Sequence, residues 1–95
     1  MNITPNHHSF TPKWKDLPII ASDHAADKMV KLGIRIYDIA TLLEYGQPCG
    51  SRRKKGTYVI CERWQGKEVK IIVAERYSGW VNDLAIIIIT IIEKR

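Results

Sequence analysis

The chain has few cysteines and no long hydrophobic run. Its 95 residues include two cysteines, Cys49 and Cys61, and one phenylalanine. The first fifteen residues lack the apolar segment that a secretory signal requires, so we expect free thiols in a reducing cytoplasm. The longest apolar run, Leu84–Ile92, is interrupted by Thr90 and is too short to cross a bilayer as a helix. These features predict a soluble cytoplasmic protein that has no membrane partner.

The sequence also lacks the patterns that hold metals and nucleotide cofactors. The histidines His7, His8 and His24 show no ligand spacing relative to one another or to the two cysteines. No glycine-rich motif of the kind that cradles phosphates is present. We therefore expect no metal and no cofactor.

Positive charge is in excess. Fifteen lysines and arginines stand against ten acidic residues, which gives a net charge of +5 and a pI near 9.4. A small basic domain is attracted to RNA, to DNA and to acidic proteins. The length allows one hydrophobic core, and the 45% apolar content is ordinary for a folded domain.

The domain organisation is simple. Pro5, Pro12 and Pro18 discourage regular structure near the N-terminus, so residues 1–18 are predicted to form a flexible arm. Residues 19–95 are predicted to form a single domain.

The stretch from Ser22 to Gly46 has the periodicity of two short amphipathic helices. In its first half, apolar residues recur at helical spacing, and Ser22 or Asp23 can cap the free N–H groups at the start. Gly33 can supply the positive φ that ends the first helix, and Gly46 closes the second. The predicted burial of Met29, Ile39 and Leu43 would hold both helices against a sheet.

Alternating apolar patterns after residue 56 predict three strands. These are Thr57–Trp64, Glu68–Arg76 and Leu84–Ile92, the first two joined by a tight Gln65-Gly66-Lys67 hairpin. Isoleucines on both faces of the last strand predict a central position in the sheet. Leu17–Ala21 is a candidate edge strand. The predicted fold class is α+β, with two N-terminal helices packed on a curved antiparallel sheet of three to four strands.

The same stretch resembles the opening of an uncharacterised family that is grouped with the RelE/ParE-like toxin superfamily. The resemblance is carried by His24-Ala25, Met29, Gly33-Ile34 and Asp38-Ile39, and it covers residues 20–92. It implies the fold just described and the activity of a toxin in a toxin–antitoxin pair. Such a toxin is an mRNA endoribonuclease, in some cases acting on ribosome-bound mRNA, with an acidic antitoxin protein as its partner.

The chain departs from that family at some positions. Leu32 stands where the family has an arginine, and Arg35 stands where a serine would cap the second helix. Several RelE-type ribonucleases carry a tyrosine or histidine after the last strand, whereas this chain ends in TIIEKR.

The candidate catalytic residues are His24, Arg63 and Arg76. At the start of a helix the dipole favours the neutral imidazole, so His24 could act as the general base for a ribose 2′-hydroxyl. Alternatively, its ring fixes the start of the helix by a hydrogen bond. By resemblance, Arg63 and Arg76 are the counterparts of the cations that the ribonucleases place on the sheet.

The candidate nucleic-acid-binding residues are the consecutive cations Arg52, Arg53, Lys54 and Lys55, together with Lys70. Flexible lysines and arginines hold phosphate backbones. The alternative is a solvated loop with only general affinity for anions.

Four aromatic residues could stack on unpaired bases, or could instead close the rim of the core. They are Tyr58, Trp64, Tyr77 and Trp80. The sequence thus leaves open a RelE-like toxin that cleaves RNA, a non-catalytic module that binds nucleic acid or protein, and a domain that takes another anionic ligand.

Overall fold

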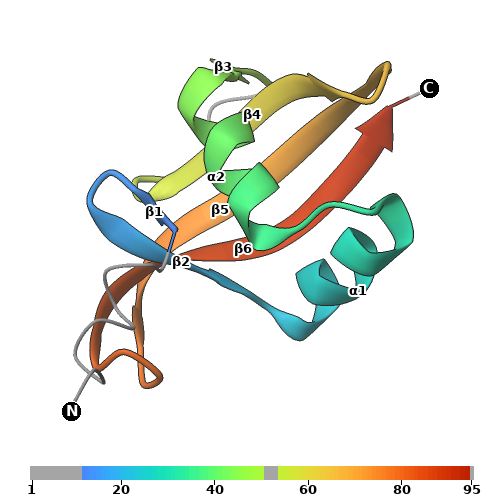
Figure 1. The fold of residues 1–95 in the computed structure, drawn as a ribbon. Helices are drawn as coiled ribbons and strands as arrows, with labels where there is room; N and C mark the ends of the chain where they lie inside the picture. Colours follow the sequence, from blue (N-terminus) through green and yellow to red (C-terminus); the bar gives the residue numbers. More distant parts are fainter. Residues whose placement is uncertain (1–11, 51–53, 95) are drawn as a thin grey trace, which may run out of the picture.

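The computed structural model of the chain describes residues 12–50 and 54–94, which form six strands and two helices (Figure 1). In chain order the elements are β1 (Lys13–Trp14), β2 (Leu17–Ala21), α1 (Asp23–Leu32), α2 (Ile36–Tyr45), β3 (Gln47–Pro48), β4 (Thr57–Trp64), β5 (Lys67–Ser78) and β6 (Asp83–Lys94).

All six strands belong to one mixed sheet with the order β1-β2-β6-β5-β4-β3. Strands β4, β5 and β6 form an antiparallel meander, whereas β2 pairs with β6 in parallel. The predicted fold class is therefore wrong. The sheet has six strands rather than three to four, it is not purely antiparallel, and both helices follow β1 and β2 rather than beginning the fold.

The N-terminal hairpin explains part of this error. Lys15 and Asp16 adopt positive φ values of 55° and 65°, which turns β1 back onto β2 and pairs Lys13 with Pro18. Asparagine, aspartate and glycine are the usual residues in such turns, so the lysine at position 15 did not indicate a turn in the sequence. The ordered strands thus begin at Lys13, ahead of the predicted domain boundary at residue 19.

The sheet curls into a half-barrel around α2 (Figure 1). Helix α2 packs against β4 and also against β1 and β2, although β1 and β4 are far apart in the sheet order. The ring of Trp14 in β1 meets the ring of Tyr58 in β4 edge-to-face at 5.2 Å, and the Lys15 ammonium lies 5.1 Å from both ring centres. These contacts close the concave side.

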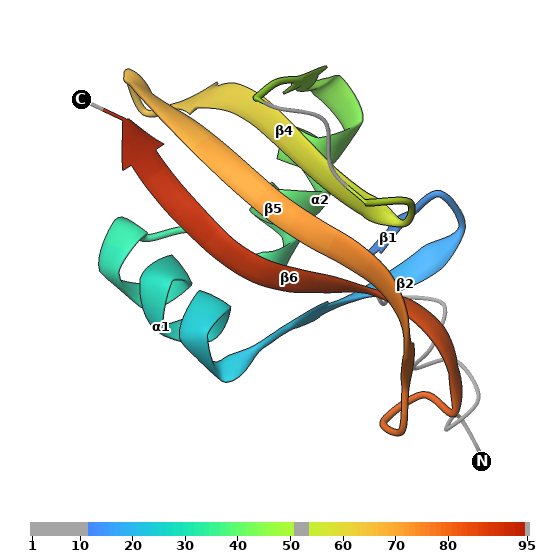
Figure 2. The ribbon, with the colours of Figure 1, turned by 180° about the vertical axis from the view of Figure 1, so that it is seen from behind.

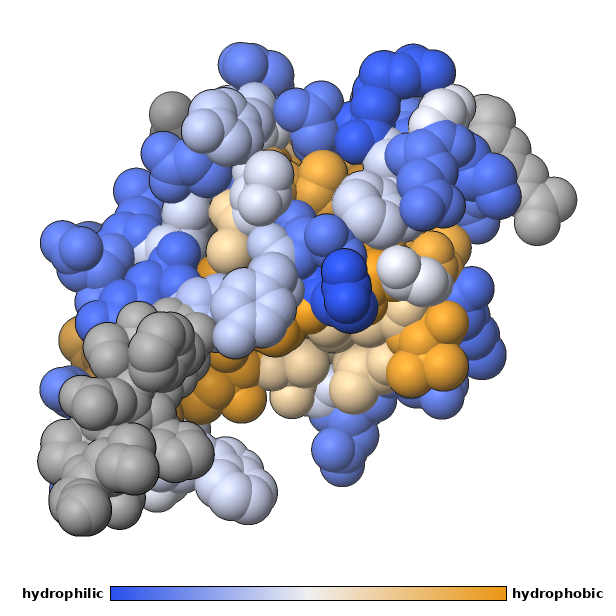
Figure 3. Space-filling model, in the orientation of Figure 1, coloured by the Kyte–Doolittle hydropathy of each residue, from blue (hydrophilic) through white to orange (hydrophobic). Residues whose placement is uncertain are grey.

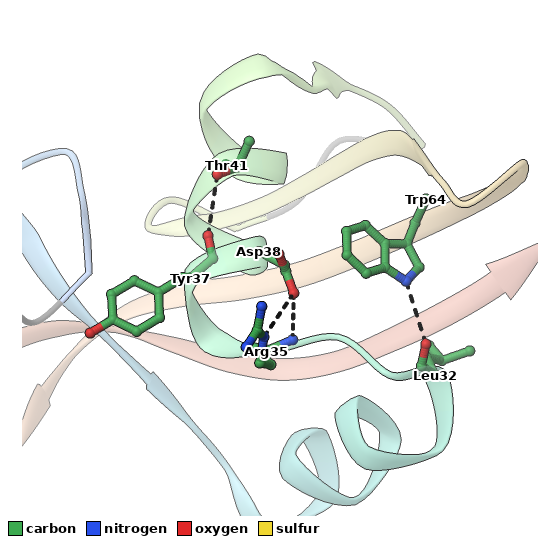
Figure 4. Close-up of polar contacts among 6 residues, drawn as sticks. All are labelled: Leu32, Arg35, Tyr37, Asp38, Thr41 and Trp64. Atoms are coloured by element: carbon green, nitrogen blue, oxygen red, sulfur yellow. Dashed lines mark hydrogen bonds and ion pairs between the residues drawn. The ribbon is translucent and has the colours of Figure 1, made fainter.

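Both helices begin and end at the predicted residues. The Ser22 hydroxyl accepts a hydrogen bond from the Ala25 N–H at 3.1 Å, and Gly33 ends α1 with φ 72°. At the start of α2 the arginine side chain has no acceptor, so the Asp38 carboxylate instead accepts from the Arg35 N–H at 2.9 Å (Figure 4). The Trp64 indole N–H donates to the Leu32 carbonyl at 3.4 Å and links β4 to the end of α1.

The core lies between the helices and β6. Strand β6 sits between β2 and β5, which confirms the predicted central position, and its residues Ile86, Ile88 and Ile91 have no exposed surface. The helices contribute the predicted Met29, Ile39 and Leu43, all of which are buried.

A matched pair of substitutions in β6 tests this core. We expect Ile88→Ala to lower the free energy of unfolding by about 2–5 kcal/mol, because it removes a fully buried side chain. Ile92 is 44% exposed on the same strand, and Ile92→Ala should cost less than about 1 kcal/mol. Urea unfolding of the two variants measures both values, and equal losses would contradict the central position of β6.

Candidate functional site

The face of the sheet opposite the helices is the candidate site, and we call it the outer face. Figure 2 shows this side, with β4 and β5 passing in front of α2 and with α1 beside β6. Side chains alternate between the two faces of a strand, so Arg63, Lys70 and Arg76 share the outer face. The sequence singled out all three.

Lys70 is the cation of this face that approaches the loop between β3 and β4. It stands directly opposite Cys61 in β4, and its side chain is half-buried. The ammonium lies 3.9 Å from the position that a Cβ on Gly50 would occupy, and Val59 lies 3.6 Å from the same position. Lys70 therefore reaches across β4 to the start of the loop that carries the consecutive cations.

The end of that loop is anchored to the sheet at Thr57 and Glu75, five residues beyond Lys70 along β5. The Thr57 N–H donates to the Lys54 carbonyl at 3.0 Å, and the Glu75 N–H donates to the Gly56 carbonyl at 2.7 Å. Lys54 and Lys55 are exposed there. We call Lys54, Lys55 and Lys70 the basic cluster. Two further predicted nucleic-acid-binding residues, Arg52 and Arg53, lie outside the described residues.

The basic cluster forms none of the ion pairs found in the described part of the chain. Those ion pairs join Lys31 to Asp27, Arg35 to Asp38, and Lys67 to Glu93. The three lysines of the cluster thus have no acidic partner among residues 12–50 and 54–94. Their charge is available to an external anion.

A disulfide bond joins Cys49 to Cys61 beside this cluster, with the two Cα atoms 5.9 Å apart. The prediction of free thiols is therefore wrong. The reason is β3, which pairs Gln47 with Cys61 and Pro48 with Ile60 and so brings Cys49 against β4. A strand of two residues has no periodicity that a sequence pattern could show.

The predicted catalytic residues are not brought together. Arg63 stands opposite Glu68, and Arg76 lies eight positions further along β5, which is about 26 Å at the rise of a strand. The Arg63 guanidinium donates to the Gly66 carbonyl at 3.0 Å in the adjacent hairpin. Their catalytic roles stay predictions.

His24 lies on α1 at the edge of β6. Its Nε2 is 3.0 Å from the Thr90 hydroxyl, and Thr90 stands opposite Ile72 in the middle of the sheet. The N-cap residue Ser22, two positions before it, also contacts β6 by donating from its N–H to the Ile88 carbonyl. Together the two contacts fix where α1 begins. The arrangement agrees with the structural alternative for His24.

Of the four candidate stacking residues, two are free to meet a ligand. Trp80 is 91% exposed and Tyr77 is 64% exposed at the β5–β6 hairpin end. Tyr58 and Trp64 are half-buried and pack against the core. On the helix side, hydrophilic residues cover much of the surface, and an apolar area lies over α1, where Val30 is 81% exposed (Figure 3).

Two hollows in the described surface lie away from the predicted catalytic residues. One, of about 280 Å³, lies between the β1–β2 hairpin and the β5–β6 hairpin and is lined by Leu17, Val81 and Leu84 among others. The second, of about 100 Å³, lies around Trp64 and Lys67. Neither hollow is lined by His24, Arg63 or Arg76.

Comparison with known protein families gives one finding that covers most of the chain. A model of the family described as a domain of unknown function, DUF4258, matches residues 21–93. The chain belongs to the DUF4258 family. No curated protein and no solved structure matches it. Neither helix of this DUF4258 domain, over the residues described, is long and apolar enough to cross a membrane.

Sequence reasoning missed two parts of the site in this DUF4258 domain. It did not pair Cys49 with Cys61, and it did not place Gly50 beside Lys70. The run from Pro48 to Gly50 is rich in turn-forming residues, but it carries no information about which strand it meets.

A double-mutant cycle tests the His24–Thr90 contact. We expect His24→Ala and Thr90→Val to show a coupling energy of about 0.5–1.5 kcal/mol in urea unfolding, because each removes the same hydrogen bond. Additive effects would show that the contact does not stabilise the fold.

Proposed function

We propose that this DUF4258 domain is a nucleic-acid-binding module whose ligand is single-stranded RNA. The basic cluster grips the phosphate backbone. The observation that supports this most is the approach of the Lys70 ammonium to Gly50, which places a cation of the sheet beside the start of the loop whose end carries Lys54 and Lys55. Contacts of lysine with phosphate supply most of the affinity in non-specific nucleic-acid binding.

The β5–β6 hairpin favours nucleic acid over a simple anion. Trp80 and Tyr77 present exposed rings, and every base has a face on which an aromatic ring can stack. From Lys70 to Ser78 strand β5 covers about 26 Å. Arg76 lies on the outer face between the basic cluster and the hairpin, so several nucleotides could run along β5.

Cleavage of mRNA by a RelE-like toxin is the second candidate, and it rests on the resemblance described above. RNA cleavage requires a base and cations around a single phosphate, whereas Arg63 in β4 stands opposite Glu68 and Arg76 lies eight residues further along β5. We therefore rank binding before catalysis. In that case an acidic antitoxin would bind the same lysines as the RNA. For either function, the location that we propose is the cytoplasm.

Removing the basic cluster tests the proposal. We expect the Lys54→Ala, Lys55→Ala, Lys70→Ala triple variant to bind a fluorescent single-stranded RNA on the order of tenfold more weakly at low salt, because phosphate contacts are lost. The salt dependence, as log K against log salt, should become shallower by about 0.7 for each lost contact. Fluorescence anisotropy at several salt concentrations gives both values.

The matched control removes the same charge elsewhere. Lys13, Lys28 and Lys31 lie in β1 and α1, and replacing all three with alanine should leave most of the affinity in place. If the two triple variants lose equal RNA affinity, the loss comes from the lower net charge and not from the position of the lysines. Shortening of the RNA by the wild-type domain, seen on a denaturing gel, would place catalysis first.

Trp80→Ala tests base stacking separately. We expect it to weaken binding of single-stranded RNA by about 1–3 kcal/mol and to leave binding of heparin unchanged, since heparin has charge but no bases. The fold should be unaffected because Trp80 is 91% exposed. Equal RNA affinity for Trp80→Ala and the wild type would remove the hairpin from the interface.

A further inference from the structure

We propose that the hollow between the β1–β2 hairpin and the β5–β6 hairpin is a binding site for a guanine base, which the Asp16 carboxylate recognises. This inference rests on the proposed function, because the base reaches the hollow as part of a single-stranded RNA. It adds a site that distinguishes one base from another to a surface that otherwise binds phosphates.

The hollow has the size and the walls that a single base needs. Its volume of about 280 Å³ lies at the lower end of the range for ligand pockets, so it suits one base rather than a larger ligand. Apolar side chains from both hairpins line it, and these are Leu17, Pro18, Val81 and Leu84. Walls of this kind hold the flat faces of a base that has left its stack.

Three charged side chains complete the lining, Lys13, Asp16 and Asp83, and the two carboxylates differ in what they already bind. Asp83 Oδ1 accepts a hydrogen bond from the Leu84 N–H at 2.7 Å. The Asp16 carboxylate takes part in none of the hydrogen bonds or ion pairs that join the described residues, and it is exposed. Both Asp16 oxygens are therefore available to a ligand.

A carboxylate with two free oxygens selects guanine among the four RNA bases. An ionised carboxylate accepts hydrogen bonds and donates none. On its base-pairing edge guanine presents two neighbouring donors, N1–H and the N2 amino group, whereas adenine and cytosine each present one amino group and uracil presents one N–H. Single strands expose this edge to protein side chains. The Asp16 carboxylate therefore forms a pair of hydrogen bonds with guanine only.

The hollow lies at the end of the RNA path along β5. Leu84, which lines it, stands directly opposite Tyr77 in the β5–β6 hairpin. The exposed rings of Tyr77 and Trp80 at that hairpin end are available to the bases on either side of a guanine in the hollow. The guanine site thus continues the surface of the proposed function.

Labelled RNA octamers test the base preference. One octamer consists of uridines, and the others carry guanosine, adenosine or inosine at one central position. We expect the guanosine octamer to bind about fivefold or more tightly than the uridine octamer, because paired hydrogen bonds to a base give at least this discrimination. Adenosine should give no such gain, and inosine, which lacks the N2 amino group, should lose it. Fluorescence anisotropy measures all four affinities.

A matched pair of variants tests the assignment to Asp16. Asp16→Asn replaces one acceptor oxygen by an amide, so the ratio of guanosine to uridine affinity should fall to about one. The turn keeps its shape, because asparagine tolerates the positive φ of 65° that Asp16 adopts. Asp83→Asn removes the same charge from the other hairpin and should keep the ratio. A ratio that persists in Asp16→Asn, or that falls in Asp83→Asn alone, would overturn the assignment.

Binding of the uridine octamer separates this inference from the proposed function. If the wild type binds all four octamers equally, the guanine site is overturned and RNA binding stands. If it binds none of them, the proposed function fails, and calorimetric titration with guanosine monophosphate decides the rest. Saturable binding that Asp16→Asn abolishes then upholds a guanine site for the free nucleotide, and the absence of such binding overturns it.

Discussion

Strand β6 must satisfy hydrogen-bonding groups along both of its edges while it buries the isoleucines on its concave face. One edge pairs with β5 along its whole length, with an irregularity at Ile89 where the register shifts. The other edge pairs with β2 only from Ile86 to Ile88, because the parallel partner ends at Ala21. Beyond that point α1 covers the edge through Ser22 and His24. The position of α1 therefore follows from the short length of β2.

The curl of the sheet around α2 decides which of its faces meets solvent. Because the sheet curls around α2 and joins Trp14 to Tyr58, the concave side is filled by apolar packing. On β4 and β5 the cations Arg63, Lys70 and Arg76 lie on the opposite, outer face, together with Glu68.

Local patterns in the sequence were enough to predict α1, α2, β4, β5 and β6. Their periodicity and caps lie within the segments themselves, so distant contacts do not change them. The parallel pairing of β2 with β6, and the two-residue strands β1 and β3, depend on partners far along the chain. For the site, Lys54, Lys55 and Lys70 stood out by charge alone, but the approach of Lys70 to Gly50 follows from the register of β4 with β5 and from the Cys49–Cys61 bond.

The positions of the charged residues favour RNA binding over RNA cleavage, two of the functions that the sequence left open. A general base has to lie within hydrogen-bond reach of the proton that it removes, and the cations that stabilise the transition state must surround the same phosphate. Here the His24 imidazole contacts the Thr90 hydroxyl, while Arg63 in β4 stands opposite Glu68 and Arg76 lies eight residues further along β5. Binding of a polyanion has no such requirement, because each phosphate along a strand can meet a different cation. Cations spread along one strand therefore suit a long, repeating ligand better than a single reacting bond.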